Sequence, residues 1–171
     1  MTLFPDAQPI VTGRIALSPL NDEALSGMPW LEAALAPEWS LEAFEVARVN
    51  SEGLLISDLE GTPEGLALVR LDNPSPGDAT IVFLAMQPER RYRGLGGEAG
   101  LAVEQLVRER TGAHRVYAGV PEGRGLAVYF WLRLGFRPLT VAEAPQAKLG
   151  LTGDPEPGIW MLRDDVWLAT Q

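Results

Sequence analysis

A cluster of glycines and arginines at residues 91–97, Arg-Tyr-Arg-Gly-Leu-Gly-Gly, is the part of this sequence that most plainly indicates chemistry. Closely spaced glycines leave backbone N–H groups unshielded, so several of these groups can point into one space. A helix that begins there adds partial positive charge, and Arg91 and Arg93 add full charges with forked donors. The sequence therefore predicts an anion site, and the number of donors favours a diphosphate over a single carboxylate.

The spacing of these glycines fits neither of the two commonest nucleotide-binding motifs. A Walker loop would end in Gly-Lys-Ser/Thr, and a dinucleotide fingerprint would have the pattern G-x-G-x-x-G. A glycine-rich helix start with solvated arginines stays open as the structural alternative. Pro88 to Pro138 holds nine arginines and five acidic residues in a chain of net charge −9, which indicates either a specific anionic ligand there or ordinary soluble surface charge. The acidic remainder would attract a cationic second ligand.

Few residues are available for covalent or metal-assisted catalysis. The chain has no cysteine, which excludes disulfides, thiolate metal sites and a cysteine nucleophile. His114 is the only histidine, so a two-histidine metal site is excluded and a Ser-His triad would depend on this one residue. No serine stands in a glycine elbow, which gives a hydrolase little support. We therefore expect no metal.

Length and composition indicate one domain over residues 1–171, because 46% hydrophobic residues in a chain of this size suffice for one core. The N-terminus lacks the basic start and apolar run of a secretory signal, and no apolar stretch has the length needed to cross a bilayer. The net charge of −9 argues against a general nucleic-acid binder. We expect a cytoplasmic protein with neither a membrane nor a nucleic-acid partner.

The elements that must position the glycine turn alternate between strand and helix patterns, which predicts an α/β (α+β) fold with a mixed sheet. Ala79–Met86 is apolar on both faces, as a central strand is. Gly97–Arg110 is an amphipathic helix, and with the strand His114–Val120 it forms a crossover unit with parallel strands. The other expected strands are Thr12–Leu20, Leu54–Leu59, Gly65–Leu71, Phe136–Val141 and Gly158–Leu162. We expect one helix from Asn21 to about Leu35 and another from Ser40, each with its first residue as the N-cap. A further helix is expected over Leu126–Leu134 and a loop over Glu143–Gly158.

Local patterns predict contacts within two of these helices. Glu104 and Arg108 are spaced i,i+4 on the polar stripe of the helix that follows the turn, where they can form an ion pair. The helix before Gly135 is apolar nearly all round, which predicts that it is buried. Gly135 supplies the left-handed residue that ends this helix, and in that motif Phe136 packs against Trp131.

Two separated motifs point to one known family. Met86-Gln-Pro-Glu-Arg-Arg-Tyr-Arg-Gly-Leu-Gly96 matches the pattern Arg/Gln-x-x-Gly-x-Gly/Ala preceded by Val-x-Pro-Glu, and Val116–Val120 with Leu134-Gly-Phe136 matches a strand, a helix and a Leu-Gly-Phe stop. In both, the chain resembles the GNAT superfamily of acyl-CoA-dependent N-acetyltransferases. Gly97-Glu-Ala99 and Gly135-Phe-Arg-Pro138 look most like the branch that acetylates ribosomal-protein N-termini, which also contains enzymes for other amines.

The resemblance implies the GNAT fold, with a mixed sheet of six to seven strands, about four helices and a central strand pair that splays apart. It implies acetyl-CoA as cosubstrate, with its pyrophosphate on the amides of the glycine turn and its pantetheine arm paired with the backbone before the turn. An unpaired amide of the splayed strand could polarise the thioester carbonyl. The residues expected to bind the coenzyme are Leu84, Ala85, Met86, Arg91, Tyr92, Arg93, Gly94, Leu95, Gly96, Gly97, Arg124, Ala127 and Trp131.

The chain departs from the family pattern at two of these positions. Arg124 stands where members usually have an asparagine that contacts CoA, whereas Ala127 fits the family's small residue. Trp131 stands where many members have a tyrosine that protonates the leaving thiolate. Tyr129 cannot replace that tyrosine, because a residue two positions along a helix points to roughly the opposite face. The general acid is therefore unassigned.

The general base is unassigned as well. Some members keep a carboxylate within the stretch that corresponds to Ile81–Met86, and this chain has none there. A base acting through water from Asp58, Glu60 or Asp72 stays open, beside the alternative that all three are surface charges. Positioning a neutral amine against the thioester can supply much of the rate without a strong acid or base.

The resemblance predicts transfer of an acetyl group from acetyl-CoA to a primary amine by direct attack, without a covalent enzyme intermediate. The acceptor is a small-molecule amine or a peptide N-terminus, and the acidic charge balance favours a cationic one. Trp30 and Trp39 lie in the region that lines the acceptor side in the family. A catalytically weak or inactive acyl-CoA-sensing domain and an unrelated phosphate-binding protein remain alternatives, and the oligomeric state, a homodimer included, stays open.

Overall fold

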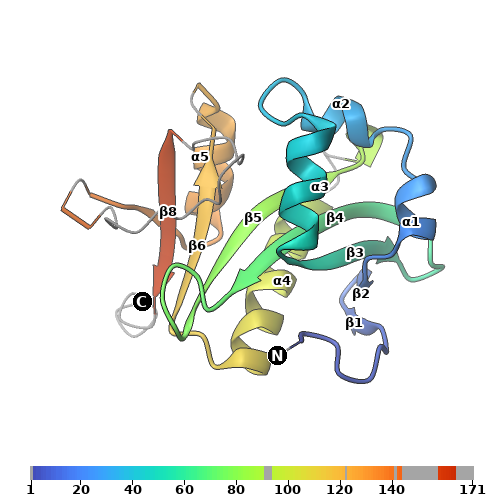
Figure 1. Ribbon diagram of the computed structural model, residues 1–171, viewed down its shortest axis with the longest axis horizontal. Helices are drawn as coiled ribbons and strands as arrows, with labels where there is room; N and C mark the ends of the chain where they lie inside the picture. Colours follow the sequence, from blue (N-terminus) through green and yellow to red (C-terminus); the bar gives the residue numbers. More distant parts are fainter. Residues whose placement is uncertain (1, 91–93, 122, 141, 144–157, 165–171) are drawn as a thin grey trace.

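The computed structural model of the chain describes residues 2–90, 94–121, 123–140, 142–143 and 158–164. Within these residues one sheet contains eight strands in the order β1-β2-β3-β4-β5-β6-β8-β7, as Figure 1 shows. The pair β5 and β6 is parallel, and the other neighbours are antiparallel. The strands are β1 Ile10–Thr12, β2 Ile15–Pro19, β3 Glu52–Asp58, β4 Pro63–Leu71, β5 Asp78–Met86, β6 Arg115–Val120, β7 Arg137–Pro138 and β8 Ile159–Asp164. The mixed α/β fold is confirmed.

The first strand was expected to be continuous over Thr12–Leu20, and the structure corrects this to a hairpin of β1 and β2. Gly13 adopts the left-handed conformation with φ of 57°, and Thr12 pairs with Ile15 across the turn. The apolar alternation runs through the turn without a break, so only the glycine signals it. This hairpin raises the strand number above the expected six to seven.

Five α-helices and one short 3₁₀ turn lie among the described residues. They are α1 Asp22–Ser26, α2 Leu31–Leu35, α3 Leu41–Val49, α4 Leu95–Thr111, α5 Gly125–Arg133 and the 3₁₀ turn Pro88–Arg90. None of these helices has both the length and the apolar character needed to cross a membrane. The helix expected from Asn21 to about Leu35 is in fact two, α1 and α2, because Gly27 ends the first one.

The two helix starts expected from side-chain caps are confirmed. Asn21 Oδ1 accepts a hydrogen bond from the backbone N–H of Ala24 at 2.8 Å, and Ser40 Oγ accepts one from Ala43 at 3.0 Å. Each cap satisfies a backbone donor that the first helical turn leaves without an intrahelical partner.

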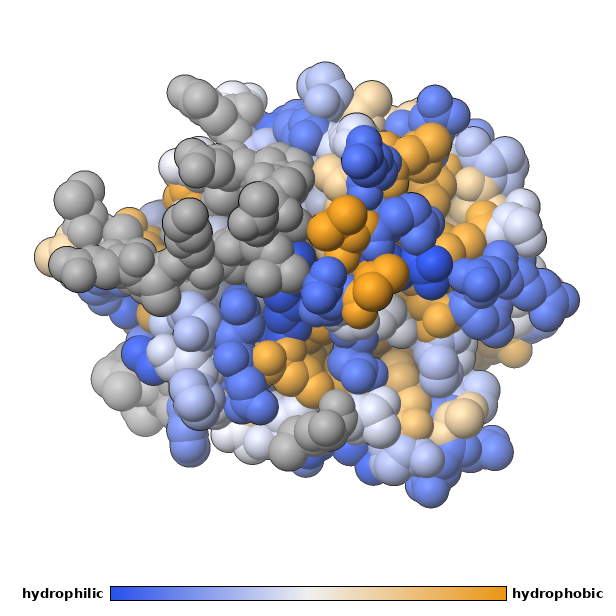
Figure 2. Space-filling view, in the orientation of Figure 1, coloured by the Kyte–Doolittle hydropathy of each residue, from blue (hydrophilic) through white to orange (hydrophobic). Residues whose placement is uncertain are grey.

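The helices cover both faces of the sheet and create two cores. Leu66 and Leu68 of β4 pack with α2 and α3, whereas Ala67 and Val69 of the same strand pack with α4 and α5. This alternation explains why the central strands are apolar on both faces. Figure 2 shows apolar spots among polar side chains on the face that carries α3.

The expected splay of the central strands is confirmed. Asp78–Ile81 of β5 pair with Arg115–Ala118 of β6, and the parallel pairing stops there. Beyond it β5 continues to Met86 paired with β4 alone, while β6 continues to Val120 paired with β8. Figure 1 shows the two strands diverging toward their carboxyl ends. We call this unpaired part the β5–β6 fork.

The helix α5 was expected to be buried on all sides, and this was wrong. Leu126, Tyr129 and Leu132 are 87%, 59% and 45% exposed, and among the helix residues Trp131 alone is buried. The helix packs one face against α4 and the sheet, and its apolar composition does not reveal that the other face is uncovered.

The end of α5 follows the expected glycine motif. Gly135 has φ of 85°, and the backbone N–H of Phe136 donates to the carbonyl of Trp131 at 3.0 Å. The rings of Trp131 and Phe136 lie 4.8 Å apart between centroids, which confirms the predicted contact. This junction fixes the direction in which the chain leaves α5 for β7.

The ion pair between Glu104 and Arg108 is confirmed, but it lies inside the protein and not on a solvent face. Glu104 is 5% exposed and also lies 3.4 Å from Nη1 of Arg163 in β8. Arg108 donates to the carbonyl of Arg163 at 2.8 Å, and Arg163 donates to the carbonyl of Leu134 at 3.0 Å. The network therefore connects α4, β8 and the end of α5.

Candidate functional site

The backbone of β5 at the fork offers hydrogen-bonding groups on the side away from β4. The N–H of Gln87 donates to the carbonyl of Glu64 at 2.7 Å, and the register pairs Leu66 with Ala85. In an antiparallel pair, alternate residues direct their peptide groups to opposite sides. Leu84 and Met86 therefore direct theirs into the fork, where β6 no longer pairs with β5. An extended ligand could pair with them as an added strand.

The side chains of this stretch fill the two cores and leave the backbone to line the fork. Leu84 and Met86 pack with the α4 core, and Ala85 packs with the α3 core. The three residues expected from the sequence thus lie at the fork, where the main chain of Leu84 and Met86 is directed into it.

The described part of the glycine turn begins α4 beside the end of β5. Gly94 is the N-cap residue with φ of 76°, and Leu95, which is 8% exposed, starts the helix. A Cβ on Gly96 would lie 3.6 Å from Met86 Cγ and 3.7 Å from Phe130 Cε2. The start of α4 therefore lies close against both β5 and α5. The other predicted phosphate-binding residues, Arg91, Tyr92 and Arg93, lie outside the described residues, as does most of the predicted loop Glu143–Gly158.

Two further glycines bring α4 and α5 together. A Cβ on Gly97 would lie 3.8 Å from Leu134 Cδ2, and one on Gly100 would lie 2.7 Å from Leu134 Cδ1 and 3.3 Å from Phe130 Cζ. A contact below 3.0 Å would force the neighbouring side chain to move, so Gly100 leaves the space that Leu134 fills.

Arg14, at the tip of the β1–β2 hairpin, lies beside the glycine turn. Its backbone N–H and its Nε donate to the two carboxylate oxygens of Glu98 at 2.5 and 2.9 Å. Its Nη2 lies 3.6 Å from the position that a Cβ on Gly94 would take. Sequence analysis missed this arginine, because the hairpin that presents it was not expected.

Arg124 lies at the start of α5 and points toward the other side of the fork. Nε and Nη2 of Arg124 donate to the two carboxylate oxygens of Glu38 at 2.7 and 3.1 Å. Glu38 precedes Trp39, whose ring packs at 5.6 Å on Phe83 of β5. Glu38 was not predicted either, because no local sequence pattern around it indicates a partner 86 residues away.

Arg124 favours the ionised form of the Glu38 carboxylate. Burial opposes its ionisation, but the hydrogen bonds and the positive charge of Arg124 outweigh burial, so the pKa of Glu38 is lowered. The hydrogen bonds that Arg124 donates to Glu38 in turn raise the pKa of Arg124. Both groups are therefore charged at neutral pH.

Ala127 and Trp131 lie deeper along α5. Ala127 is half-buried against the α4 core, and Trp131 is 6% exposed and in contact with Phe130 and Phe136. Tyr129 points outward under Arg133, whose guanidinium lies 5.9 Å from its ring. The contribution of Ala127 and Trp131 to coenzyme binding remains a prediction.

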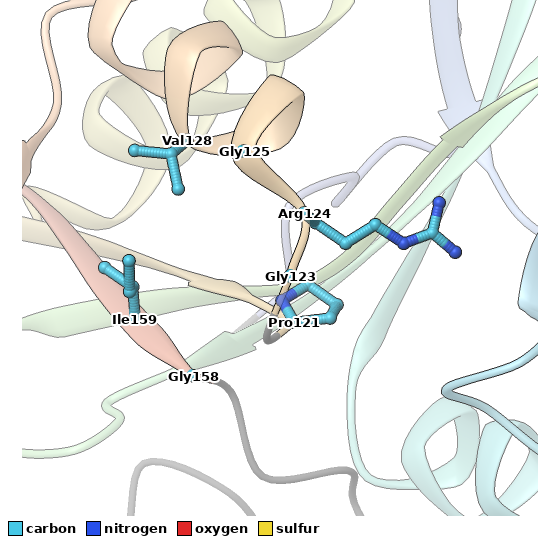
Figure 3. Close-up of a pocket in the computed structure, with 7 residues that line it drawn as sticks. All are labelled: Pro121, Gly123, Arg124, Gly125, Val128, Gly158 and Ile159. Carbon is cyan, nitrogen blue, oxygen red and sulfur yellow. The ribbon is translucent and has the colours of Figure 1, made fainter.

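An open pocket of about 570 Å³ lies beside the start of α5. Figure 3 shows that the side chain of Arg124 points away from the rest of the lining. The lining residues are Pro121, Gly123, Arg124, Gly125, Val128, Gly158 and Ile159. Apart from Arg124 these described lining residues offer apolar surface and backbone, so they can hold part of a ligand but none of them is an acid or a base.

Two of the three carboxylates considered as bases stabilise turns. Asp58 Oδ1 accepts hydrogen bonds from the N–H groups of Glu60 and Thr62 at 2.9 and 2.8 Å, and Asp72 Oδ1 accepts one from Gly77 at 2.9 Å. Glu60 is exposed. A fourth carboxylate, that of Glu64, was overlooked: it is 1% exposed on β4 opposite Gln87, at the end of β5 that borders the fork.

Comparison with known proteins agrees with the family resemblance of the two sequence motifs. Residues 19–136 match the family described as the acetyltransferase (GNAT) family. No curated protein matches the sequence. Many solved structures share the fold, among them the following three. A candidate ribosomal-protein-serine acetyltransferase from Vibrio cholerae has a TM-score of 0.71 at 20% identity, over 96% of this chain and 99% of that one.

The other two structures cover nearly as much. The ribosomal-protein-S18-alanine N-acetyltransferase from Escherichia coli has a TM-score of 0.63 at 19% identity, over 88% of this chain and 93% of that one. A GNAT family acetyltransferase from Elizabethkingia anophelis with acetyl-CoA bound has a TM-score of 0.64 at 16% identity, over 90% and 99%. At these identities the likeness is one of fold.

Proposed function

Because this chain belongs to the acetyltransferase (GNAT) family, we propose that it transfers an acetyl group from acetyl-CoA to a primary amine. The observation that carries the proposal is the β5–β6 fork, into which Leu84 and Met86 direct their peptide groups beside the start of α4. This arrangement suits a ligand with an extended amide-containing arm and an anionic end.

Acetyl-CoA has both parts. Its pantetheine arm would pair with the backbone of Leu84 and Met86, and its diphosphate would lie on the amides of Gly94–Gly97 with help from Arg91 and Arg93. The acetyl-CoA bound to the structurally similar Elizabethkingia protein supports this choice. A backbone N–H of the fork would donate to the thioester oxygen as negative charge develops there.

The reaction needs no covalent enzyme intermediate. The amine nitrogen attacks the thioester carbonyl carbon, the C–S bond breaks, and the proton lost by the nitrogen ends on the CoA thiol. The products are an amide and CoA. The protein's contribution is to hold the amine and the thioester in contact and to stabilise the oxyanion.

We propose that the acceptor is a cationic small molecule or a peptide N-terminus. The net charge of −9 supports a cationic acceptor, and the name of the similar Escherichia coli structure supports a peptide one. The aromatic rings of Trp39 and Phe83 lie on the α3 side of β5, where they would border the acceptor.

We expect the rate to follow the neutral fraction of the amine. With saturating acetyl-CoA, kcat/KM should rise about tenfold per pH unit until the pKa of the acceptor is reached, because proton removal then occurs before binding. The measurement is a pH profile for two amines of different pKa. A plateau at the same pH for both amines would reveal a base in the enzyme, and Glu64→Gln would then be the first variant to test.

Thiol release from acetyl-CoA tests the function itself. The acceptor panel is spermidine, an aminoglycoside, a basic tripeptide with a free N-terminus and the same tripeptide with its N-terminus blocked. Calorimetry with CoA is run in parallel. Binding of CoA without turnover on any amine would favour an acyl-CoA-sensing domain, and absence of CoA binding would overturn the proposal.

A further inference from the structure

Two ion pairs lie at opposite ends of the β5–β6 strand pair, and only the second lies at the fork. Where the strands still pair, Nε and Nη2 of Arg115 donate to the carboxylate oxygens of Asp78 at 2.8 and 3.0 Å. Beyond the carboxyl end of β6, Arg124 holds Glu38 in the same two-bond geometry. The first pair joins the strands directly, whereas the second joins α5 to the α2–α3 loop.

The second pair spans the fork. Arg124 begins the helix that follows β6, and Glu38 is held over β5 by Trp39, which packs on Phe83 in the stretch of β5 that β6 does not pair with. A ligand arm that lies along Leu84 and Met86 would therefore have this pair near its path. Figure 3 shows Arg124 extending from the start of α5 away from its neighbours in the pocket.

The pair is suited to opening and closing. The side chains of Arg124 and Glu38 are 48% and 21% exposed, so water can replace either partner. Ion pairs at this exposure are weak, although the two parallel hydrogen bonds define one closed geometry. By contrast, the Asp78 side chain in the other pair is 2% exposed, which favours an ion pair that stays closed.

We propose that Glu38 and Arg124 form a latch that closes over the pantetheine arm when the coenzyme lies in the fork. This inference rests on the proposed function. The closed latch retains the coenzyme and holds β5 and α5 at the spacing in which the peptide groups of Leu84 and Met86 face the thioester. In this role both side chains are positioning residues.

The latch is tested by the rate at which CoA leaves the protein. In stopped-flow displacement, Glu38→Gln and Arg124→Gln should each raise the CoA dissociation rate about two- to fivefold, the range that a weak ion pair allows. The double variant E38R/R124E should restore the slow rate, because the pair is re-formed with its charges exchanged. Arg48→Gln, which breaks ion pairs with Glu45 on α3 and with Asp22 on α1, should leave the rate unchanged.

The alternative role for Arg124 is direct contact with the coenzyme. In that case only Arg124→Gln would speed dissociation, Glu38→Gln would slow it by freeing the arginine, and the charge exchange would not rescue; any of these results overturns the latch. Equal dissociation rates in all variants would overturn it as well. If the unmodified protein binds no CoA, the proposed function fails, which is a distinct outcome. Thermal unfolding of each variant verifies that it is folded.

Discussion

Replacement of Gly94 by valine is expected to weaken CoA binding about a hundredfold. Gly94 has φ of 76°, a conformation that a β-branched residue adopts only under strain, so the turn must rearrange. Loss of two amide hydrogen bonds to a charged phosphate, at about 1.5 kcal/mol or more each, gives a change of this size. Calorimetric titration with CoA measures it.

The matched control lies at the other end of the same helix. Gly112 ends α4 with φ of 69°, and a Cβ there would meet no atom within 4 Å. Valine at 112 therefore introduces the same backbone strain far from the fork, and CoA affinity should stay within about twofold of the original value. Equal losses in both variants would mean that strain in α4, and not the turn, determines binding.

Replacement of Glu104 by glutamine is expected to lower the free energy of unfolding by several kcal/mol. Glu104 is the carboxylate between Arg108 and Arg163, and the substitution removes the negative charge that contacts both of these largely buried guanidinium groups. Breaking a buried ion pair on one side costs about 3–5 kcal/mol. For a chain of this size that corresponds to a fall in Tm of roughly 6–20 °C, measured by calorimetry or circular dichroism.

An exposed ion pair provides the comparison. Glu45 contacts Arg48 at 2.9 Å with half of its side chain in water, so Glu45→Gln should change the free energy of unfolding by less than about 1 kcal/mol. If Glu104→Gln were as mild as Glu45→Gln, the three-residue network would not be holding α4, α5 and β8 together.

Local sequence patterns predicted the features that depend on neighbouring residues. The caps of Asn21 and Ser40 and the glycine stop at Gly135 are each specified within a few residues, and all three are confirmed. The central strand was equally clear, because it must be apolar on both faces. The splay between β5 and β6 came from the family resemblance and not from the pattern of the residues.

What escaped prediction depends on distant parts of the chain. Periodicity shows that α5 is apolar, but it does not show that the outer face of the helix is exposed. Periodicity also shows that Glu104 can pair with Arg108, but not that Arg163 of β8 contacts Glu104 and buries the pair. In the same way Glu38 meets Arg124, and Arg14 meets Glu98, across more than 80 residues. Such pairs exist only once the fold has formed.

The close approach of α4 and α5 through Gly97 and Gly100 has a mechanical consequence. On that face of the sheet, the two sides of the fork touch through tightly packed side chains that leave little room for movement. On the opposite face they are joined by the exposed contact between Arg124 and Glu38. If the two halves separate, they should rotate about the helix contact as about a hinge axis, and the displacement should be greatest on the α3 side, where we expect the amine to enter.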